Sequence, residues 1–504
     1  MRKLSAFAFM LFFIHAGAQN TASSITKTTA HFDAYIQNAL QLWKAPGLAV
    51  VVVKNGQVVF NKAYGVKDIQ THEPFTTATL SVCASTTKAM TAVCMGMLVD
   101  AGKIKWTDKV SDVYPELKLY DNYANSELTV KDLFTHNTGL GNADMLWVYD
   151  YGIDTIIHQM RFIQPAYSFR SSFTYQNLMY MVAGEVIRKV SGIPWEKFIK
   201  DSLFTRLGMN NTFPSYKESL VSNNHITPHY MYEDSVVETI PFIDSKTVGS
   251  AGGVWSCTDD INKWLLFLLD SAKVNGKTLL KPGTYAELFK PQAMVTTEEF
   301  YPTQQLTHPH WTTYGLGWFQ EDYKGKMVQF HTGSLDGAVA ILGLIPDENF
   351  GIYIFVNMDH TEIRHALMYK AMDLFVFNDD KNDWSKDFYQ LYTARAKKNK
   401  AADDSTDAKR VLNTKPSLAL KNYTGNYSNE IYGKATVALQ GDSLVAKFPN
   451  NVNIDLSHWH YDTFRGQFEH KWYGKDMFQF SLNPEGKVKD FTFLGVVYDK
   501  DEDD

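Results

Sequence analysis

Two β-branched segments that lie far apart in the sequence each carry the pattern of a β-hairpin. Residues 47–65, GLAVVVVKNGQVVFNKAYG, place Asn55 and Gly56 between apolar runs, and a tight hairpin turn favours residues that tolerate positive φ. Residues 338–357, AVAILGLIPDENFGIYIFVN, have Pro, Asp, Asn and Gly in their turn. Helical spacing of apolar residues precedes the first hairpin and follows the second. The sequence therefore predicts one antiparallel sheet, completed by distant parts of the chain and flanked by terminal helices.

The chain between the hairpins is mostly helical in pattern. KAMTAVCMGMLVDAG and NLMYMVAGEVIRKVSG space their apolar residues helically and end at glycine. We therefore expect an α/β (α+β) domain at 19–393, an antiparallel sheet with helices plus a helical insertion. The charged segment 394–416 lacks aromatic residues and predicts a linker. Short alternating strands at 417–504 predict a small all-β domain, whose aromatic residues favour core packing over a ligand cavity.

The first residues have the pattern of an export signal. Arg2 and Lys3 precede an apolar run at 6–14, and small residues end the segment at Ala18. The run is too short to span a bilayer. We expect a signal peptide at 1–18 and an exported protein, either periplasmic or secreted.

Charge and composition exclude several classes of function. A formal net charge of -6 over 504 residues gives no electrostatic attraction to nucleic acid. No later apolar run approaches about 18 residues, so we expect no stable membrane insertion. Cys83, Cys94 and Cys257 are too few for a disulfide scaffold and lack the paired spacing of a zinc site. We expect no metal and no other cofactor, and the sequence leaves the oligomeric state open.

The stretch CASTTKAM, residues 83–90, places Ser85 three positions before Lys88. Average composition gives roughly two Ser-x-x-Lys matches in a chain of this length, and the second here runs from Ser24 to Lys27. Only Ser85 is followed at once by a helical pattern, and a helix N-terminus favours developing negative charge. Lys88 lies on the same helix face and can accept the hydroxyl proton if burial lowers its pKa.

Two further polar segments are candidates to complete a site. Tyr175 and Asn177 form a Tyr-x-Asn triplet at the start of the second helical pattern. The same triplet begins at three other tyrosines, Tyr120, Tyr123 and Tyr427. These lie in a polar loop or in the predicted C-terminal domain. His331 begins His-Thr-Gly just before the second hairpin, where Gly333 permits close approach of a backbone.

Ser-x-x-Lys, Tyr-x-Asn and His-Thr-Gly, in this order on such a scaffold, resemble the serine β-lactamase and penicillin-binding-protein-like superfamily. The Tyr-x-Asn form is similar to its class C β-lactamase, esterase and D-peptidase branch. LTVKDLFTHNTGLG, LFTRLGMNNT, SAGGVWSCTDDINKW and YGLGWF look like landmarks of that branch. The resemblance spans residues 30–375, and the C-terminal region is similar to the lipocalin-like β domain often appended to these hydrolases.

The resemblance implies a serine hydrolase that needs no cofactor and acts on a small-molecule or peptide substrate. Ser85 would attack a carbonyl to form an acyl-enzyme, with Lys88 and Tyr175 sharing the role of general base. The backbone N–H groups of Ser85 and Ser334, which follows Gly333 at the substrate-binding edge, would form the oxyanion hole. Asn177 would hydrogen-bond the substrate amide or the lysine amine.

The substrate class depends on His331, the fourth implied catalytic residue. β-Lactamases usually carry lysine at the matching position, whereas histidine is mostly uncharged at neutral pH and would bind a substrate carboxylate weakly. We therefore expect an ester, amide or D-amino-acid peptide as substrate, with residual β-lactam turnover rising toward pH 6. A true β-lactamase and a D-alanyl-D-alanine carboxypeptidase are alternatives. Other classes remain open: a non-catalytic acyl-binding receptor or sensor, or a ligand-binding C-terminal domain on a hydrolase scaffold.

Overall fold

The computed structural model describes residues 25–232, 236–242 and 246–501, so the expected signal peptide and Ser24 lie outside the described residues. The chain divides into two compact units. The sheet unit comprises residues 1–105, 190–244 and 249–392, and the barrel unit comprises 106–189, 245–248 and 393–504. The predicted domain boundaries, drawn from sequence composition, differ from this division because the helical insertion groups with the C-terminal residues.

The sheet unit is built on an eight-stranded sheet in which every neighbouring pair is antiparallel. Its order is β2 (Gln57–Gly65), β1 (Gly47–Lys54), β14 (Phe350–Val356), β13 (Ala338–Ile345), β12 (Lys326–Leu335), β11 (Phe319–Tyr323), β10 (Thr312–Tyr314) and β9 (Ala293–Met294). Both predicted hairpins are present, and β1 pairs with β14 from Leu48 opposite Val356 to Lys54 opposite Phe350. The predicted sheet of distant segments is confirmed.

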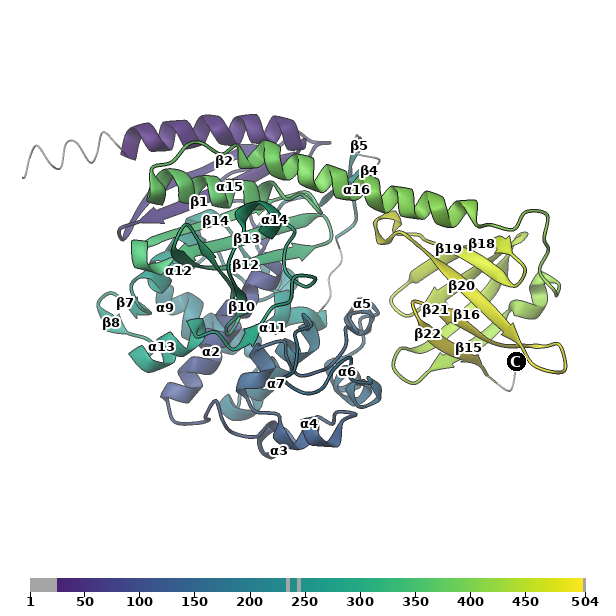
Figure 1. Cartoon of the computed structure of the whole chain (residues 1–504). Helices are drawn as coiled ribbons and strands as arrows, with labels where there is room; N and C mark the ends of the chain where they lie inside the picture. The colour runs from purple at the N-terminus through teal and green to yellow at the C-terminus, as the bar shows by residue number, and fades with distance from the viewer. Residues whose placement is uncertain (1–24, 233–235, 243–245, 502–504) are drawn as a thin grey trace, which may run out of the picture. The chain divides into compact units, whose positions relative to one another are not determined.

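Helices cover both faces of this sheet (Figure 1). A side chain at Gly343 would press against Met368 of α15 (Ile363–Met372), whereas one at Gly351 would meet Leu265 of α12 (Thr258–Leu269). Helices α2 (Thr87–Asp100) and α13 (Pro282–Phe289) also belong to this unit. Shorter ones are α8 (Trp195–Ile199), α9 (Thr205–Leu207), α10 (Tyr216–Ser219), α11 (Gly249–Gly252) and α14 (Gln304–Thr307). Residues 25–43 are also helical.

The barrel unit contains the predicted helical insertion and the predicted all-β domain. The insertion forms α3 (Val110–Val113), α4 (Asn122–Glu127), α5 (Met145–Val148), α6 (Ile153–Gln159) and α7 (Asn177–Ser191). The β domain is a closed barrel of β15 (Gly425–Asn429), β16 (Gly433–Gln440), β17 (Ser443–Phe448), β18 (Val452–His460), β19 (Thr463–Phe468), β20 (Lys475–Leu482), β21 (Val488–Phe493) and β22 (Val496–Lys500).

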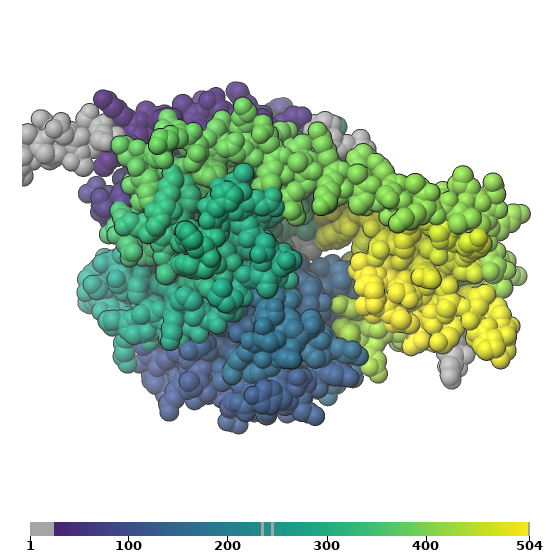
Figure 2. All heavy atoms as spheres, viewed as in Figure 1, coloured from purple at the N-terminus to yellow at the C-terminus, as the bar shows by residue number. Residues whose placement is uncertain are grey.

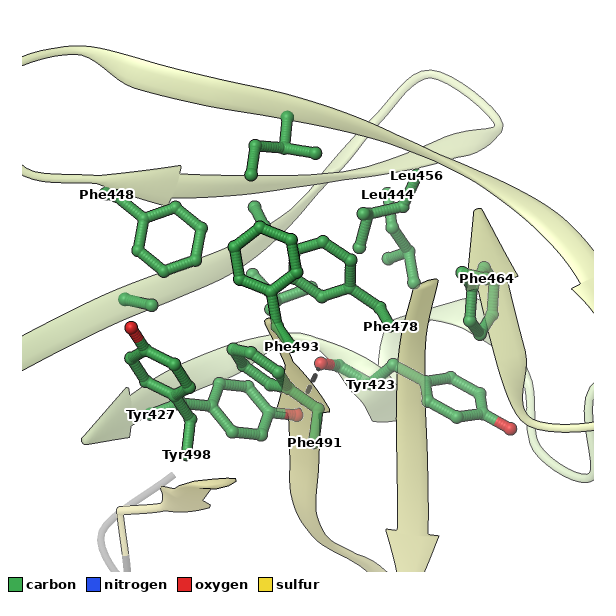
Figure 3. Packing of buried hydrophobic residues seen from close by; sticks show 14 of the residues in the cluster. Tyr423, Tyr427, Leu444, Phe448, Leu456, Phe464, Phe478, Phe491, Phe493 and Tyr498 are labelled. Atoms are coloured by element: carbon green, nitrogen blue, oxygen red, sulfur yellow. Dashed lines mark hydrogen bonds between the residues drawn. The ribbon is translucent and has the colours of Figure 1, made fainter. Parts of the chain in front are cut away.

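Aromatic side chains fill the barrel interior (Figure 3). The rings of Phe478 and Phe493 stack with centroids 4.2 Å apart, and those of Phe491 and Tyr498 stack at 4.9 Å. Tyr427 lies in the same core and donates its hydroxyl hydrogen to the Tyr423 carbonyl oxygen. The aromatic residues of this domain therefore form a packed core, as the sequence predicts.

The segment predicted as a linker is largely helical. Helix α16 (Trp384–Ala408) continues through most of residues 394–416, and its residues from 394 onward lie at the surface (Figure 2). Alanine, lysine and arginine are strong helix formers, and no proline or glycine interrupts the segment before Pro416. Among the described helices, none combines the length and apolar character needed to cross a bilayer.

Candidate active site

Ser85 lies on a sharp turn between a short strand and helix α2. Strand β3 (Ser81–Val82) pairs with β6 (Trp255–Ser256), and the Cys83 N–H donates to the Val254 carbonyl oxygen at 2.8 Å. Ala84 then has a φ of 46°, a conformation that costs a residue with a side chain about 1 kcal/mol or more. The turn delivers the half-buried Ser85 to the N-terminus of α2, as the sequence predicts.

Lys88 lies beside Ser85 and is completely buried. Its Nζ is 3.1 Å from Ser85 Oγ and donates to the Ala251 carbonyl oxygen of α11 at 2.8 Å. Thr91, one turn further along α2, donates to the neighbouring Ser250 carbonyl oxygen at 2.7 Å. These bonds fix α11 against α2 and hold the amine within hydrogen-bonding distance of the serine hydroxyl.

The backbone of β12 passes directly over the Ser85 turn. A Cβ at Gly333 would overlap the Cys83 carbonyl oxygen and lie 3.2 Å from the Ser85 backbone nitrogen. Only glycine permits this approach, for the reason that the sequence suggested. Ser334 follows on the same strand and is exposed. The backbone of β12 is therefore in direct contact with the serine turn, next to the half-buried Ser85 and the exposed Ser334.

His331 lies behind this edge and does not open onto it. The side chain is buried; Nδ1 donates to the Thr332 carbonyl oxygen at 2.6 Å, and Nε2 accepts from the Tyr314 hydroxyl at 2.9 Å. Burial, followed by the positive charge of Lys88, lowers the pKa of His331 to about 3. The expectation that it gains charge toward pH 6 is therefore wrong, because burial disfavours the charged imidazole.

Arg364 is a site residue that the sequence reasoning missed. Its buried guanidinium donates from Nη1 to the Gly333 carbonyl oxygen at 2.5 Å and to Ser334 Oγ at 3.0 Å. Glu362 accepts from it, and although burial alone would raise the pKa of that carboxyl, Arg364 and His365 hold it well below its usual range. A signal for it was the charged pair Glu362 and Arg364 at the start of a helical segment that is mostly apolar.

Tyr175 and Asn177 belong to the barrel unit, at the start of α7. Tyr175 is half-buried, and its ring centroid is 4.4 Å from that of His136, whose Nδ1 accepts from the Gln176 N–H at 3.0 Å. Asn177 is buried, with Nδ2 3.1 Å from each carboxylate oxygen of Asp144. Each of the two residues is thus held by neighbours within its own unit.

The structure separates Tyr175 from the other tyrosines that head the same triplet. Tyr120 and Tyr123 are exposed, and Tyr427 lies in the barrel core.

Within the sheet unit, the structure brings Ser85, Lys88, Gly333 and Ser334 together, with His331 behind them. Among residues 25–232, 236–242 and 246–501, no three His, Cys, Asp or Glu side chains cluster as a metal site requires.

Comparison with protein-family models matches residues 32–376 to the family described as Beta-lactamase. Residues 409–503 match a second model, described as Domain of unknown function (DUF3471). The first match contains all the candidate site residues, and the second contains the barrel strands.

Individual relatives and solved structures extend these matches. An unguisins hydrolase of Aspergillus campestris is 26% identical over 424 residues, which cover 81% of this chain and 77% of that protein. Protein flp of Staphylococcus aureus is 26% identical over 332 residues, 65% of this chain and 62% of its own length. The octameric penicillin-binding protein homologue from Pyrococcus abyssi has a TM-score of 0.62 at 20% identity, over 94% of this chain and 99% of its own. SurE has a TM-score of 0.57 at 18% identity, over 95% and 99%.

Proposed function

This chain belongs to the beta-lactamase family and is a serine hydrolase, and we propose that it cleaves an ester, amide or D-amino-acid peptide through an acyl-enzyme on Ser85. The observation that carries the proposal is the 3.1 Å separation of Ser85 Oγ from the buried Lys88 amine. A serine hydroxyl becomes a good nucleophile only when an adjacent base removes its proton. In the second Ser-x-x-Lys pattern, Ser24 lies outside the described residues and Lys27 belongs to the helix at 25–43, so the expectation that only Ser85 is followed by a helix is wrong. Ser85 remains the candidate because its hydroxyl lies beside the buried Lys88 amine.

In the acylation step Ser85 Oγ attacks the substrate carbonyl carbon, and its proton passes to the general-base pair of Lys88 and Tyr175. The tetrahedral intermediate then expels an alcohol or amine, which takes up that proton as it leaves. We assign Tyr175 a share in this transfer, because a second titratable hydroxyl can relay the proton to the leaving group. The buried position of Lys88 excludes bulk water from this exchange.

Two backbone N–H groups are assigned to the developing oxyanion, those of Ser85 and Ser334. The missing side chain at Gly333 supports this assignment, because it lets the strand edge approach the serine turn. Arg364 supports it further: its bonds to the Gly333 carbonyl oxygen and Ser334 Oγ fix the edge in place. Rigid donors of this kind stabilise charge without reorganising during the reaction.

Deacylation reverses the roles of the same groups. A water molecule loses a proton to the Lys88 and Tyr175 pair and attacks the acyl carbon. The intermediate releases the carboxylic acid, and Ser85 Oγ recovers its proton. Asn177 would orient the acyl group or the amine during both steps, and no step requires a cofactor.

The preference for esters or peptide amides over β-lactams rests on the neutral state of His331. With a pKa lowered to about 3, His331 supplies no positive charge to a substrate carboxylate between pH 5 and 8. Arg364 is the nearby cation, but its charge is shared with Glu362. The similarity to proteins named as unguisins hydrolases supports turnover over a receptor that only binds.

Export remains part of the proposal and rests on the pattern of residues 1–18. Mass spectrometry of the protein expressed in its own host tests it directly. We expect a mature N-terminus at Gln19, and an intact Met1 in the same sample would contradict export by this signal.

The substrate class is tested with a panel of a p-nitrophenyl ester, a D-amino-acid p-nitroanilide, a D-alanyl-D-alanine peptide and a cephalosporin. We expect many turnovers per enzyme for the ester or the anilide, with kcat/KM exceeding that for the cephalosporin. A single equivalent of product followed by a stable adduct would indicate an acyl-binding receptor. A higher kcat/KM for the cephalosporin, or for the D-alanyl-D-alanine peptide, would instead identify a β-lactamase or a carboxypeptidase.

A further inference from the structure

One segment of the barrel unit connects the β-barrel to the candidate active-site residue Asn177. It runs from Asp144 to Tyr151 and includes the single turn of α5. Its first residue contacts Asn177, and its last residues contact the barrel. The segment therefore joins two parts of this unit whose functions have so far been treated separately.

The barrel holds the end of this segment through both stacking and hydrogen bonds. Tyr149 is only 2% exposed, and its ring is parallel to that of Phe448 within 8°, with centroids 5.4 Å apart. Asn450 Nδ2 donates to the Val148 carbonyl oxygen at 2.9 Å. Tyr149 is thus packed into the barrel's hydrophobic core rather than lying against its surface.

A glycine turn of the barrel is shaped to receive the last tyrosine of the segment. The Tyr151 hydroxyl donates to the Tyr432 carbonyl oxygen at 2.9 Å. The next residue, Gly433, has a φ of 71°, and a Cβ there would collide with the Tyr151 hydroxyl oxygen. The turn that leads into β16 therefore depends on glycine for its backbone conformation and for its contact with Tyr151.

The other end of the segment fixes the orientation of Asn177. Both oxygens of the Asp144 carboxylate lie 3.1 Å from Asn177 Nδ2, so the donor side of the amide faces Asp144. Asn142 holds the carboxylate in turn, donating from Nδ2 at 3.2 Å and accepting from the Asp144 N–H at 3.0 Å. The Oδ1 side of Asn177 is consequently turned away from Asp144, which makes it the acceptor for a substrate N–H or for an ammonium group.

Tyr432 also connects the two ends of the segment electrostatically. Burial, and with it the negative charge of Asp144, raises the pKa of the Tyr432 phenol. The residue whose carbonyl binds Tyr151 thus also lies close enough to Asp144 to feel its charge.

We propose that Asp144 is a positioning residue for Asn177 and that the C-terminal barrel holds Asp144 in place by binding Tyr149 and Tyr151. The inference rests on the proposed role of Asn177 in acyl transfer. It gives the barrel a function that requires no ligand: the barrel keeps one active-site amide in the orientation in which it accepts a hydrogen bond. Loss of such support displaces a reacting group, and small displacements have large effects on rate.

A double-mutant cycle between Asp144 and Asn177 in the full chain tests the first half of the proposal. Asp144→Ala should lower kcat/KM for the p-nitroanilide by about tenfold or more, and Asp144→Asn, which retains one acceptor oxygen, by less. Adding Asp144→Ala to Asn177→Ala should change kcat/KM less than about twofold, because Asp144 would act only through Asn177. Multiplicative losses, which a merely structural role produces, would overturn the proposal.

Two glycine substitutions in the barrel test the second half. Gly433→Ala and Gly441→Ala introduce a side chain at positive φ in two turns of the same barrel, but space is open around Gly441. Gly433→Ala should lower kcat/KM by about as much as Asp144→Ala does. The kcat/KM of Gly441→Ala should remain within about twofold of that of the parent protein. Equal effects of the two substitutions, or no effect of Gly433→Ala, would overturn the role of the barrel.

The same measurements separate failure of this inference from failure of the proposed function. If Asn177→Ala alone leaves kcat/KM unchanged, Asn177 has no part in the reaction and the premise fails. If Asn177→Ala lowers kcat/KM but Asp144→Ala does not, only the positioning role fails. Fluorophosphonate labelling of Ser85 in each variant shows whether the nucleophile is intact.

Discussion

The sheet unit and the barrel enclose different kinds of side chain. Near Ser85, the sheet unit buries an amine, an imidazole and a guanidinium, those of Lys88, His331 and Arg364. The barrel interior is instead packed with phenylalanine and tyrosine rings. Burial of a polar group has a cost unless it finds partners, whereas burial of an aromatic ring stabilises the fold directly.

This difference indicates which property each region determines, the chemistry of the site or the stability of the fold. The polar groups around Ser85 are all bonded to backbone carbonyls or to neighbouring side chains, which gives them one fixed arrangement. Such an arrangement is what acyl transfer requires. The rings of the barrel fill its interior with hydrocarbon, so a ligand-binding role inside the barrel has no support in the packing. Substitutions in the two regions should therefore affect different measurements.

The largest expected effect is on chemistry at the serine turn. Ser85→Ala removes the nucleophile and should lower ester turnover by about 10³-fold or more, while the circular dichroism spectrum stays that of the parent. Mass spectrometry should show no fluorophosphonate adduct. Ser24→Ala, in the other Ser-x-x-Lys pattern, is the matched control and should label and turn over normally. Labelling of the Ser85 variant would contradict the assignment.

A truncation in the barrel core should affect stability instead of chemistry. Phe478 is fully buried between Phe491 and Phe493, and Phe478→Ala should cost the barrel about 3–5 kcal/mol of unfolding free energy. Urea denaturation followed by tyrosine fluorescence measures this loss. At 25 °C in the absence of urea, the rate of fluorophosphonate labelling should remain within about twofold of the parent. A labelling rate that falls in parallel with stability would break the proposed separation of roles.

Substitutions in the proposed general-base pair should lower activity less than loss of Ser85. Lys88→Ala and Tyr175→Phe should each lower kcat by about 10²-fold, the usual scale for general-base loss. The double variant should lose much less activity than the product of the two single losses, because the two groups would act together in one proton transfer. Tyr120 heads another Tyr-x-Asn triplet and is exposed, so Tyr120→Phe serves as the control. Independent, multiplicative losses would count against a shared proton network.

The sequence predicted those structural features that depend on residues close together in the chain. Asn55-Gly56 specified a hairpin, and the Ser85 to Lys88 spacing indicated a shared helix face, because both depend on neighbours in the sequence. The positive charge near Ser334 could not be predicted in this way. Arg364 lies beside Ser334 only because β12, β13 and α15 pack together. Charged composition predicts a linker at 394–416, but helix α16 (Trp384–Ala408) extends through most of it because its alanine, lysine and arginine residues are strong helix formers.

Burial of His331 also escaped sequence reasoning, because the residues next to a single histidine in the sequence do not show what packs against it in the fold. The lowered pKa of His331 removes the reason to expect β-lactam turnover to rise toward pH 6. In the unfolded chain His331 titrates near its usual value of 6.5, whereas in the folded protein its pKa is about 3. Between these values the unfolded state binds one more proton, so the free energy of unfolding should rise with pH in this window.

The smallest expected effect follows from this difference in proton binding. For one group the slope is at most about 1.4 kcal/mol per pH unit, present as pH falls below 6.5 and absent above it. His331→Gln keeps a donor and an acceptor but cannot titrate, so its unfolding free energy should depend less steeply on pH between 4.5 and 6. Urea denaturation at half-unit intervals measures both slopes. Parallel slopes for the two proteins would show that His331 titrates normally when folded, and would reopen it as a charged contact for a substrate carboxylate.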